Sequence, residues 1–167
     1  MDASTPLIDP LGLIEAYLGG TQTLRRSLDG LSLEQMRAHP IPGTWSCLQV
    51  LGHLVDSEIA WCHRIQRVAS EPRPLLIGYD ETHFAATLGY QDLDPARELD
   101  LIDRLRARLA GMLRGLPAEA WTRTGVHSER GLITLAEMVR VEAEHIHHHV
   151  RFLEAKRAAM GLAPATT

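Results

Sequence analysis

The stretch from Thr134 to about Ala159 constrains the fold more than any other, because it places histidines where a helix needs core residues. Residues four apart on a helix are rotated by only about 40°, so His145 and His149 lie one above the other on one face. The same face carries the apolar period of this stretch and is expected to point into the core. Two imidazoles stacked on an inward face form half of a transition-metal site, and the other half must come from elsewhere in the chain.

Three further stretches carry apolar residues at helical spacing and are expected to be long helices. They run from about Pro10 to Leu28, from an N-cap at Ser46 to about Ala69, and from about Pro95 to Leu113. Capping boxes, in which a serine or threonine precedes a glutamine or glutamate by three residues, mark the second and fourth helices and a short turn at 32–35. With no convincing strand and no internal repeat, the simplest fold class is all-α, a four-helix bundle.

The connection between the second and third helices spans roughly 20 residues, which is more than a helical hairpin needs. A crossover of this length lets the next helix run parallel to its predecessor. Two turns of helix are expected within it, at Glu81–Leu88, and it could help to form a pocket at the mouth of the bundle. The segment from Pro117 to Arg130 is expected to be loop with at most a short helix. A solvated face is expected for Arg104, Arg106 and Arg108.

Composition places the chain among ordinary soluble globular proteins of one domain, 1–167, with a tail from about 161 expected to be frayed. Its net charge of −4 and pI near 6.1 give no electrostatic footprint for nucleic acid or an anionic membrane. No apolar run approaches the roughly 20 residues of a membrane span. Residues 1–6 lack the basic-then-apolar order of a signal peptide, so a cytoplasmic location is expected.

The two cysteines, Cys47 and Cys62, both fall on the expected second helix. A rise of 1.5 Å per residue separates them by roughly 22 Å, so they cannot form a disulfide with each other. Each is expected to be a small buried or half-buried residue. Cys47 lies in the first helical turn, where the helix dipole favours a thiolate, so a reactive role is the alternative.

His53 is the best candidate for a third inward donor, because it lies within the apolar part of the second helix. A lone histidine in such a stretch is more often a satisfied core residue than a ligand. Three inward histidines without a metal, however, would leave ring nitrogens without partners in a dry core, at a cost of about 1–3 kcal/mol each. Because coordination removes that cost, His53, His145 and His149 are predicted to bind one metal.

Motifs near the second and fourth helices, and between them, occur in an order and spacing typical of a known family. In chain order they are Gly43-Thr-Trp45-Ser46, His53, Asp56-Ser-Glu58, Arg64, Tyr79-Asp-Glu, Arg104-x-x-x-Arg108, Leu116-Pro117, Gly131-Leu-Ile-Thr134-Leu-Ala-Glu137 and His145-x-x-x-His149. Each motif is weak alone, but together they resemble the DinB/YfiT-like superfamily over nearly the whole chain.

The resemblance implies an up-down-down-up bundle, in agreement with the long crossover, and a divalent metal held by His53, His145 and His149. Zinc is the default ion, and nickel or iron also suits imidazole ligands. The family includes transferases and isomerases that use a low-molecular-weight thiol, such as bacillithiol, mycothiol or glutathione, and proteins described only as metal-dependent hydrolases. Members often form homodimers, although the sequence itself does not decide the oligomeric state.

Two acidic residues could orient the histidines by accepting their second ring N–H. Asp56 lies one turn after His53, and Glu142 lies one turn before His145. The alternative for these carboxylates is a surface ion pair. Such pairs could also join Arg64 to Glu58 or Glu144.

The remaining candidates near the site each have two interpretations. Trp45 is either a packing residue or a wall of the pocket, and His127 either lines the pocket or lies in a solvated loop. His148, about 60° around the helix from His145, could replace it as a ligand if the register differs, whereas His147 is expected at the surface.

An open three-histidine site is the arrangement of a catalytic metal and not of a closed structural one. The leading hypothesis is therefore a metal-dependent enzyme acting on a small-molecule substrate, either a hydrolase or a low-molecular-weight-thiol S-transferase. The competing hypothesis is a non-enzymatic metal-storing or stress-associated protein, and a third is a plain bundle whose histidines are structural. No other nucleophile, base or phosphate-binding motif separates these outcomes.

Overall fold

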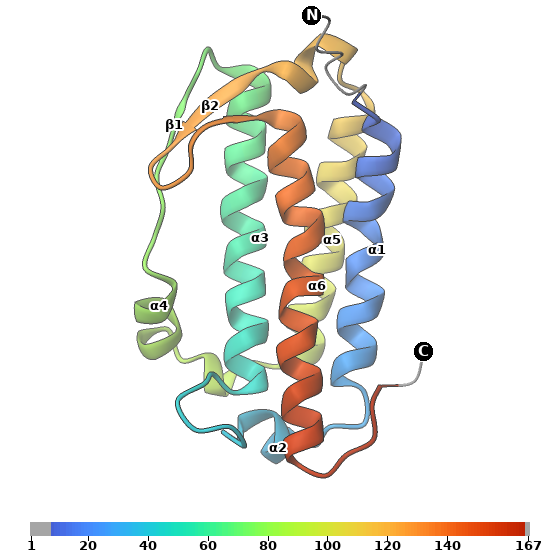
Figure 1. Cartoon of the computed structure of the whole chain (residues 1–167), viewed down its shortest axis with the longest axis vertical. Helices are drawn as coiled ribbons and strands as arrows, with labels where there is room; N and C mark the ends of the chain where they lie inside the picture. Colours follow the sequence, from blue (N-terminus) through green and yellow to red (C-terminus); the bar gives the residue numbers. More distant parts are fainter. Residues whose placement is uncertain (1–7, 166–167) are drawn as a thin grey trace, which may run out of the picture.

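The computed structural model describes residues 8–165 and shows four long helices side by side, with a small sheet at one end (Figure 1). In chain order the elements are α1 (Pro10–Leu28), α2 (Leu33–Arg37), α3 (Cys47–Ser70), β1 (Leu75–Leu76), α4 (Glu81–Thr87), the 3₁₀ turn η1 (Tyr90–Asp92), α5 (Pro95–Arg114), the 3₁₀ turn η2 (Ala118–Thr122), β2 (Thr124–His127), β3 (Gly131–Thr134) and α6 (Leu135–Ala159). The four expected long helices are confirmed to within one residue at each end.

Local capping explains where these helices start. Ser46 before α3 and Thr134 before α6 each accept a hydrogen bond from the backbone N–H three residues on, and the side chains of Gln49 and Glu137 bond back to the cap. These reciprocal pairs satisfy two of the N–H groups that a helix start leaves without partners. The same arrangement starts the short helix α2.

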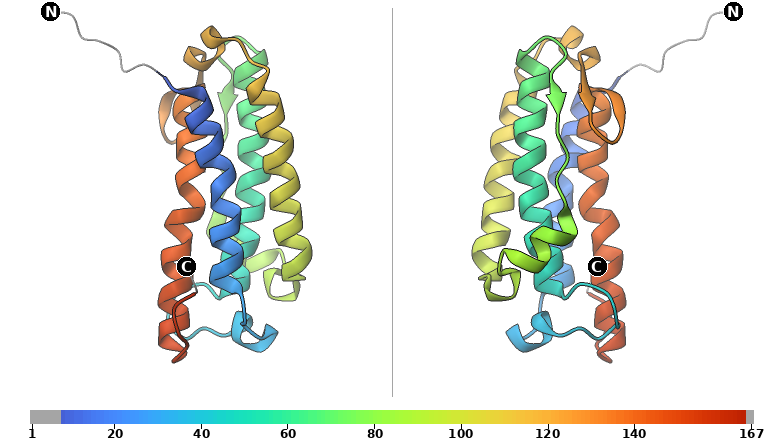
Figure 2. Two further views of the ribbon diagram at one scale, coloured as in Figure 1. Left: turned by 90° about the vertical axis from the view of Figure 1, so that its right-hand side faces the viewer. Right: turned by 90° about the vertical axis from the view of Figure 1, so that its left-hand side faces the viewer.

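The four long helices form an up-down-down-up bundle, as expected. α1 and α6 run in one direction and lie side by side, while α3 and α5 run in the opposite direction (Figures 1 and 2). α3 also packs against α6, and α1 against α5. The crossover from α3 to α5 runs back along the outside of α3 and carries α4 (Figure 2). This return path allows α3 and α5 to be parallel neighbours.

The prediction that the chain has no strands is wrong. β1 pairs in parallel with β2, and β2 pairs antiparallel with β3, which leads directly into α6. The segment between Pro117 and Arg130 therefore contains a strand as well as a 3₁₀ turn, and not only loop. Strands of two and four residues are too short to show an alternating pattern, and β1 pairs with a segment about 50 residues away, so no local signal marked them.

The core of the bundle divides into two apolar clusters with buried polar groups between them. One cluster lies toward the sheet and includes Trp121 and Met138; the other lies toward α2 and includes Leu51 and Leu153. At the level between them, three charged side chains are almost completely buried: Glu58 of α3, Arg106 of α5 and Glu142 of α6. We call these three residues the polar layer.

No helix within residues 8–165 is long and apolar enough to cross a membrane. Residues 1–6, on which the expectation of a cytoplasmic location depends, lie outside the described residues. At the other end, Leu162 packs against the apolar cluster near α2, and the Ala165 backbone N–H bonds to Glu154. Residues 166 and 167 lie outside the described part.

Candidate metal centre

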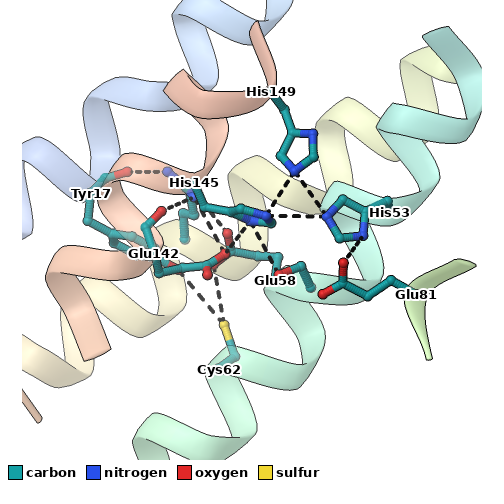
Figure 3. Close-up of polar contacts among 10 residues, drawn as sticks. Tyr17, His53, Glu58, Cys62, Glu81, Glu142, His145 and His149 are labelled. Atoms are coloured by element: carbon teal, nitrogen blue, oxygen red, sulfur yellow. Dashed lines mark hydrogen bonds and ion pairs between the residues drawn. The ribbon is translucent and has the colours of Figure 1, made fainter. Parts of the chain in front are cut away.

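Three histidines from two helices converge on one point inside the bundle (Figure 3). The Nε2 atom of His53, on α3, lies 3.2 Å from the Nε2 atoms of both His145 and His149, on α6, and the last two are 3.1 Å apart. The convergence expected from the helical spacing is confirmed as geometry. A metal bound by imidazoles at about 2.1 Å with tetrahedral angles needs nitrogens about 3.4 Å apart, which is close to this triangle.

Burial keeps two of these rings uncharged. Burial and the neighbouring His145 together lower the pKa of His53 to about 4, although Glu142 opposes the change. Burial, together with His145 and His53, lowers the pKa of His149 to about 3. A neutral imidazole can donate a lone pair to a metal, whereas a protonated one cannot.

The three facing nitrogens also fit a metal better than they fit one another. A hydrogen bond between two of them uses one donor and one acceptor, so three mutually facing Nε2 atoms cannot all be satisfied by one another. The Nδ1 atoms of His53 and His149 are buried and have no hydrogen-bond partner within residues 8–165. A divalent ion at the centre of the triangle would accept all three lone pairs at once.

Polar side chains lie on the outer sides of His145 and His53. On the outer side of His145, Nδ1 lies 3.3 Å from the Ser57 hydroxyl and 3.8 Å from a Glu142 carboxylate oxygen. Glu81, at the start of α4, has a carboxylate oxygen 3.8 Å from His53 Nδ1 (Figure 3). The crossover thus brings a carboxylate to His53, and the sequence offered no signal for this contact or for that of Ser57.

Of the two carboxylates predicted to orient histidines, only one lies beside its histidine. Glu142 lies beside His145, as expected, but Asp56 is turned toward the crossover and accepts a hydrogen bond from the Tyr90 hydroxyl. Both carboxylates are three positions from their histidine, so helical geometry alone does not separate them; the difference is the Tyr90 hydroxyl, which the crossover brings to Asp56. The hydrogen-bonding capacity of Asp56 is therefore used by the crossover and not by a histidine.

The polar layer lies directly beneath the histidines. The Arg106 guanidinium is fully buried, 2.7 Å from a Glu58 carboxylate oxygen, and it also donates to the backbone carbonyls of Tyr17 and Glu142. The Tyr17 hydroxyl donates to the other oxygen of Glu58. Burial and the nearby Glu142 raise the pKa of the Glu58 carboxyl, against the effect of Arg106.

Two expectations are corrected here. Arg106 is not part of a solvated face, and Glu58 forms its ion pair with Arg106 instead of with Arg64 at the surface. The sequence did contain a signal, because Arg106 continues the apolar stripe of Ile102 and Leu109 at helical spacing. An arginine on such a stripe requires a buried carboxylate partner, since an unpaired buried charge is very costly.

Both cysteines are free and buried, so the expected burial is confirmed. The Cys47 side chain is completely buried, and burial raises the pKa of its thiol, although Lys156 and Arg157 act in the opposite direction. The alternative of a reactive Cys47 thiolate is therefore not supported. Burial also raises the pKa of Cys62, to about 12, and its sulfur lies beside the Glu58 carboxylate.

Two cavities adjoin the histidine triangle on different sides. A cavity of about 80 Å³ reaches His145 and is lined mostly by polar side chains, including Ser57, Arg64 and His127. A cavity of about 280 Å³ reaches His149 and is lined mostly by apolar groups, among them Trp45 and Phe152, with Lys156. Each cavity contains one of the candidate ligands in its wall.

The structure also places the three remaining candidate residues, Trp45, His127 and His148. Trp45 lies against His53, with ring centroids 5.1 Å apart, and lines the apolar cavity, while His127 is a buried residue of β2 that lines the polar cavity. His148 is exposed and contacts Arg151, so the register needs no substitute ligand. His127 thus lines a cavity, and Trp45 fits both of its interpretations, because it lines a cavity and also packs against the apolar cluster near α2.

We expect the metal-free protein to lose stability as the pH falls from 7 to 5. Because His53 and His149 have lowered pKa values in the fold, the unfolded chain, whose histidines titrate near 6.5, binds more protons below that pH. Each of the two histidines should therefore lower the free energy of unfolding by about 2 kcal/mol over this interval, and proton uptake by the folded-state Glu58 carboxyl, whose pKa is raised, should offset part of that fall. Thermal unfolding at each pH measures this fall in the free energy of unfolding.

Two variants test which histidines cause it. His149→Asn should make the free energy of unfolding depend less on pH, and His63→Asn, at an exposed position, should leave the dependence unchanged. Equal pH dependence in the parent protein and both variants would contradict the prediction.

Comparisons with known sequences agree with this geometry. The sequence model of the DinB superfamily matches residues 17–153. A protein of Oceanobacillus iheyensis named "Putative metal-dependent hydrolase" is 31% identical over 127 residues, which cover 76% of this chain and 73% of that protein. The "Putative metal-dependent hydrolase YfiT" of Bacillus subtilis is 26% identical over 139 residues, which cover 83% of this chain and 78% of that protein.

Solved structures share the fold. YfiT from Bacillus subtilis, described as "a probable metal-dependent hydrolase with an unusual four-helix bundle topology", matches with a TM-score of 0.88 at 23% identity, over 98% of this chain and 94% of that one. A mycothiol-dependent maleylpyruvate isomerase matches with a TM-score of 0.70 at 16% identity, over 87% of this chain and 60% of that one. From its sequence match and its fold, the chain belongs to the DinB superfamily.

Proposed function

We propose that this chain is a divalent-metal-dependent enzyme acting on a small molecule, with the ion held by His53, His145 and His149. The observation that carries the proposal is the triangle of Nε2 atoms, 3.1–3.2 Å on each side, with a cavity at two of its corners. A metal-storing protein needs no such cavities. A plain structural bundle would not leave three imidazole nitrogens facing one another.

Three imidazoles leave at least one coordination position for a substrate or water. A divalent ion there would supply Lewis acidity, which polarises a bound group and lowers the pKa of a bound water or thiol. The protein's own side chains would keep the rings oriented, through Ser57 and Glu142 at His145 and through Glu81 at His53. Zinc is the first choice of ion, and nickel or iron also suits these donors.

Hydrolysis is the first candidate reaction. The relatives at 31% and 26% identity carry names that describe metal-dependent hydrolases. The polar cavity at His145 can hold several water molecules, because about 10–15 Å³ of such volume is enough for one. Water as the second reactant would therefore have access to the metal from this side.

Transfer of a low-molecular-weight thiol is the second candidate, and the apolar cavity at His149 favours it. Two cavities on different sides of one ion suit two ligands, such as a thiol and the molecule that accepts it. Lys156 lines the apolar cavity and forms no ion pair within the described residues, so its ammonium is available for a carboxylate of the kind that such thiols carry.

Cobalt substitution would distinguish the two reactions. Cobalt(II) suits imidazole donors as zinc does, and a thiolate bound to it gives a charge-transfer absorption band in the near ultraviolet. Bacillithiol, mycothiol and glutathione should be added separately to the cobalt-loaded protein, with their S-methyl derivatives as controls. A saturable band with one thiol and none with its S-methyl derivative would establish the thiol candidate, and no band with any of them would leave hydrolysis.

An inert protein would contradict the whole proposal. If the protein retains its metal, but neither thiols nor a panel of small esters and amides binds or reacts, the metal-storing or stress-associated alternative is supported instead. The cytoplasmic location, the single domain over 1–167 and the homodimer stay predictions, for which fractionation, limited proteolysis and light scattering are the measurements.

A further inference from the structure

Three hydrogen-bond donors without acidic partners line the polar cavity beside His145. They are the His127 imidazole, the Tyr79 hydroxyl and the Arg64 guanidinium. His127 Nε2 and the Tyr79 hydroxyl oxygen are buried and have no hydrogen-bond partner in the part of the chain that the structure describes. Buried polar groups in folded proteins are nearly always paired, so unpaired ones that share a cavity with a candidate metal ligand mark a place where water or a small polar ligand can accept their hydrogen bonds.

The structure fixes His127 as a donor. Its Nδ1 accepts a hydrogen bond from the backbone N–H of Glu129 at 3.2 Å, so in the neutral ring the proton is on Nε2. Burial and the nearby Arg64 lower the pKa of His127, which favours the neutral ring. The ring stacks on Trp61, with centroids 5.9 Å apart and planes 14° apart, and its side chain is only 4% exposed. The Nε2–H group is therefore held rigidly in one direction.

Arg64 is a buried cation held by aromatic rings. Its guanidinium carbon lies 5.5 Å from the centre of the Trp61 ring and 5.9 Å from that of Tyr79, and one N–H donates to the backbone carbonyl of Ile77. The side chain is 8% exposed, and no carboxylate of residues 8–165 lies within 4.0 Å of it. Its other N–H groups remain available to an anion.

The charges around the cavity indicate the class of anion. Two arginines, Arg64 and Arg130, and two glutamates, Glu81 and Glu129, line it, so their formal charges cancel. A phosphate dianion would need an excess of positive charge, whereas a carboxylate brings a single negative charge. Three donors that line one cavity can match the lone pairs of a carboxylate.

We propose that this cavity binds the carboxylate of the substrate, with hydrogen bonds from His127 Nε2–H, the Tyr79 hydroxyl and Arg64. The inference deepens the proposed function and rests on it where it calls the ligand a substrate. It restricts that substrate to small carboxylic acids whose reacting group lies on the side of the histidine triangle. His127, Tyr79 and Arg64 would then determine specificity, without being ligands of the metal.

Acetate is a probe small enough for the cavity. It should be titrated into zinc-loaded and metal-free protein at constant ionic strength, with the ring ¹⁵N signals of His127 as the readout and, in variants that lack this residue, the indole ¹⁵N signal of Trp61, which lines the same cavity. We expect a saturable shift of the Nε2 signal in both forms. His127→Phe, which keeps a ring against Trp61 but has no donor, should weaken acetate binding to the metal-free protein at least about tenfold. His127→Gln, which places an N–H group at a similar reach, should restore most of the affinity.

The matched control is His63→Phe, the same change at an exposed histidine of α3, which should bind acetate like the parent protein. The proposal is overturned if acetate does not shift the His127 signal, if His127→Phe binds it as the parent does, or if inorganic phosphate binds more tightly than acetate. Metal content, measured on the same samples, separates the two proposals. Acetate binding that depends on His127 in a protein retaining no zinc would support the cavity and contradict the metal centre.

Discussion

His149→Ala is expected to lower the affinity of the protein for zinc by more than about 100-fold. Loss of a side chain that only orients a ligand typically costs 10–100-fold in metal affinity, and His149 is placed as a ligand itself. The wild-type protein should hold one ion per chain after dialysis against a competing chelator, and the variant should lose it. Elemental analysis of the dialysed protein and competition with a chromogenic chelator measure the two quantities.

The adjacent residue provides the control. His148→Ala removes an imidazole from the next position of α6, but this ring is exposed and contacts Arg151, so the zinc affinity should not change. The triple variant of His53, His145 and His149 tests the whole set. Stoichiometric zinc in the triple variant would show that the ion binds elsewhere, and the proposed function would have to be abandoned.

Arg106→Met should destabilise the protein by about 3–5 kcal/mol, because it leaves the carboxylates of Glu58 and Glu142 buried without a cation. For a chain of this size the loss corresponds to a fall in the unfolding temperature of roughly 10 °C. Methionine retains much of the volume of the side chain, so the effect would come from charge more than from a cavity. Thermal and urea unfolding of the zinc-free protein measure it.

Two further variants make this prediction specific. Adding Glu58→Gln to Arg106→Met removes one of the two buried carboxylates that lost their cation and should recover part of the free energy of unfolding. Arg104→Met changes an exposed arginine of the same helix and should change the free energy of unfolding by no more than about 0.5 kcal/mol. If Arg104→Met and Arg106→Met were equally stable, the buried ion pair would not stabilise the fold as described.

Much of the bundle was predictable because its signals are local. Ser46 with Gln49 and Thr134 with Glu137 mark helix starts within four residues of sequence, and the spacing of His145 and His149 is enough to place them on one face. The alignment of His53 with them followed from its place on an inward face. These inferences depend on short-range geometry, which is the same in every helix.

Contacts made by the crossover were not predictable in this way. Glu81 lies close to His53, and the Tyr90 hydroxyl donates a hydrogen bond to Asp56. Both Glu81 and Tyr90 belong to the crossover, whose path depends on the pairing of β1 with β2. Arg106 was misplaced for a different reason, since arginine is usually exposed and its buried partner is on another helix. What could not be predicted were pairings between residues far apart in sequence, each of which becomes favourable only when the others are formed.

The polar layer has a consequence for the longitudinal alignment of the four helices. Apolar stripes alone tolerate sliding, because one leucine can take the place of another a turn away. If α5 slid by one turn, about 5.4 Å, the guanidinium of Arg106 would leave Glu58 and enter an apolar cluster. Gly20 reinforces this position, because a Cβ atom there would lie only 3.0 Å from the guanidinium. Because Arg106 contacts both Glu58 of α3 and the Glu142 carbonyl of α6, this one side chain helps to set the height at which α3 and α6 face each other, and with it the meeting point of their imidazoles.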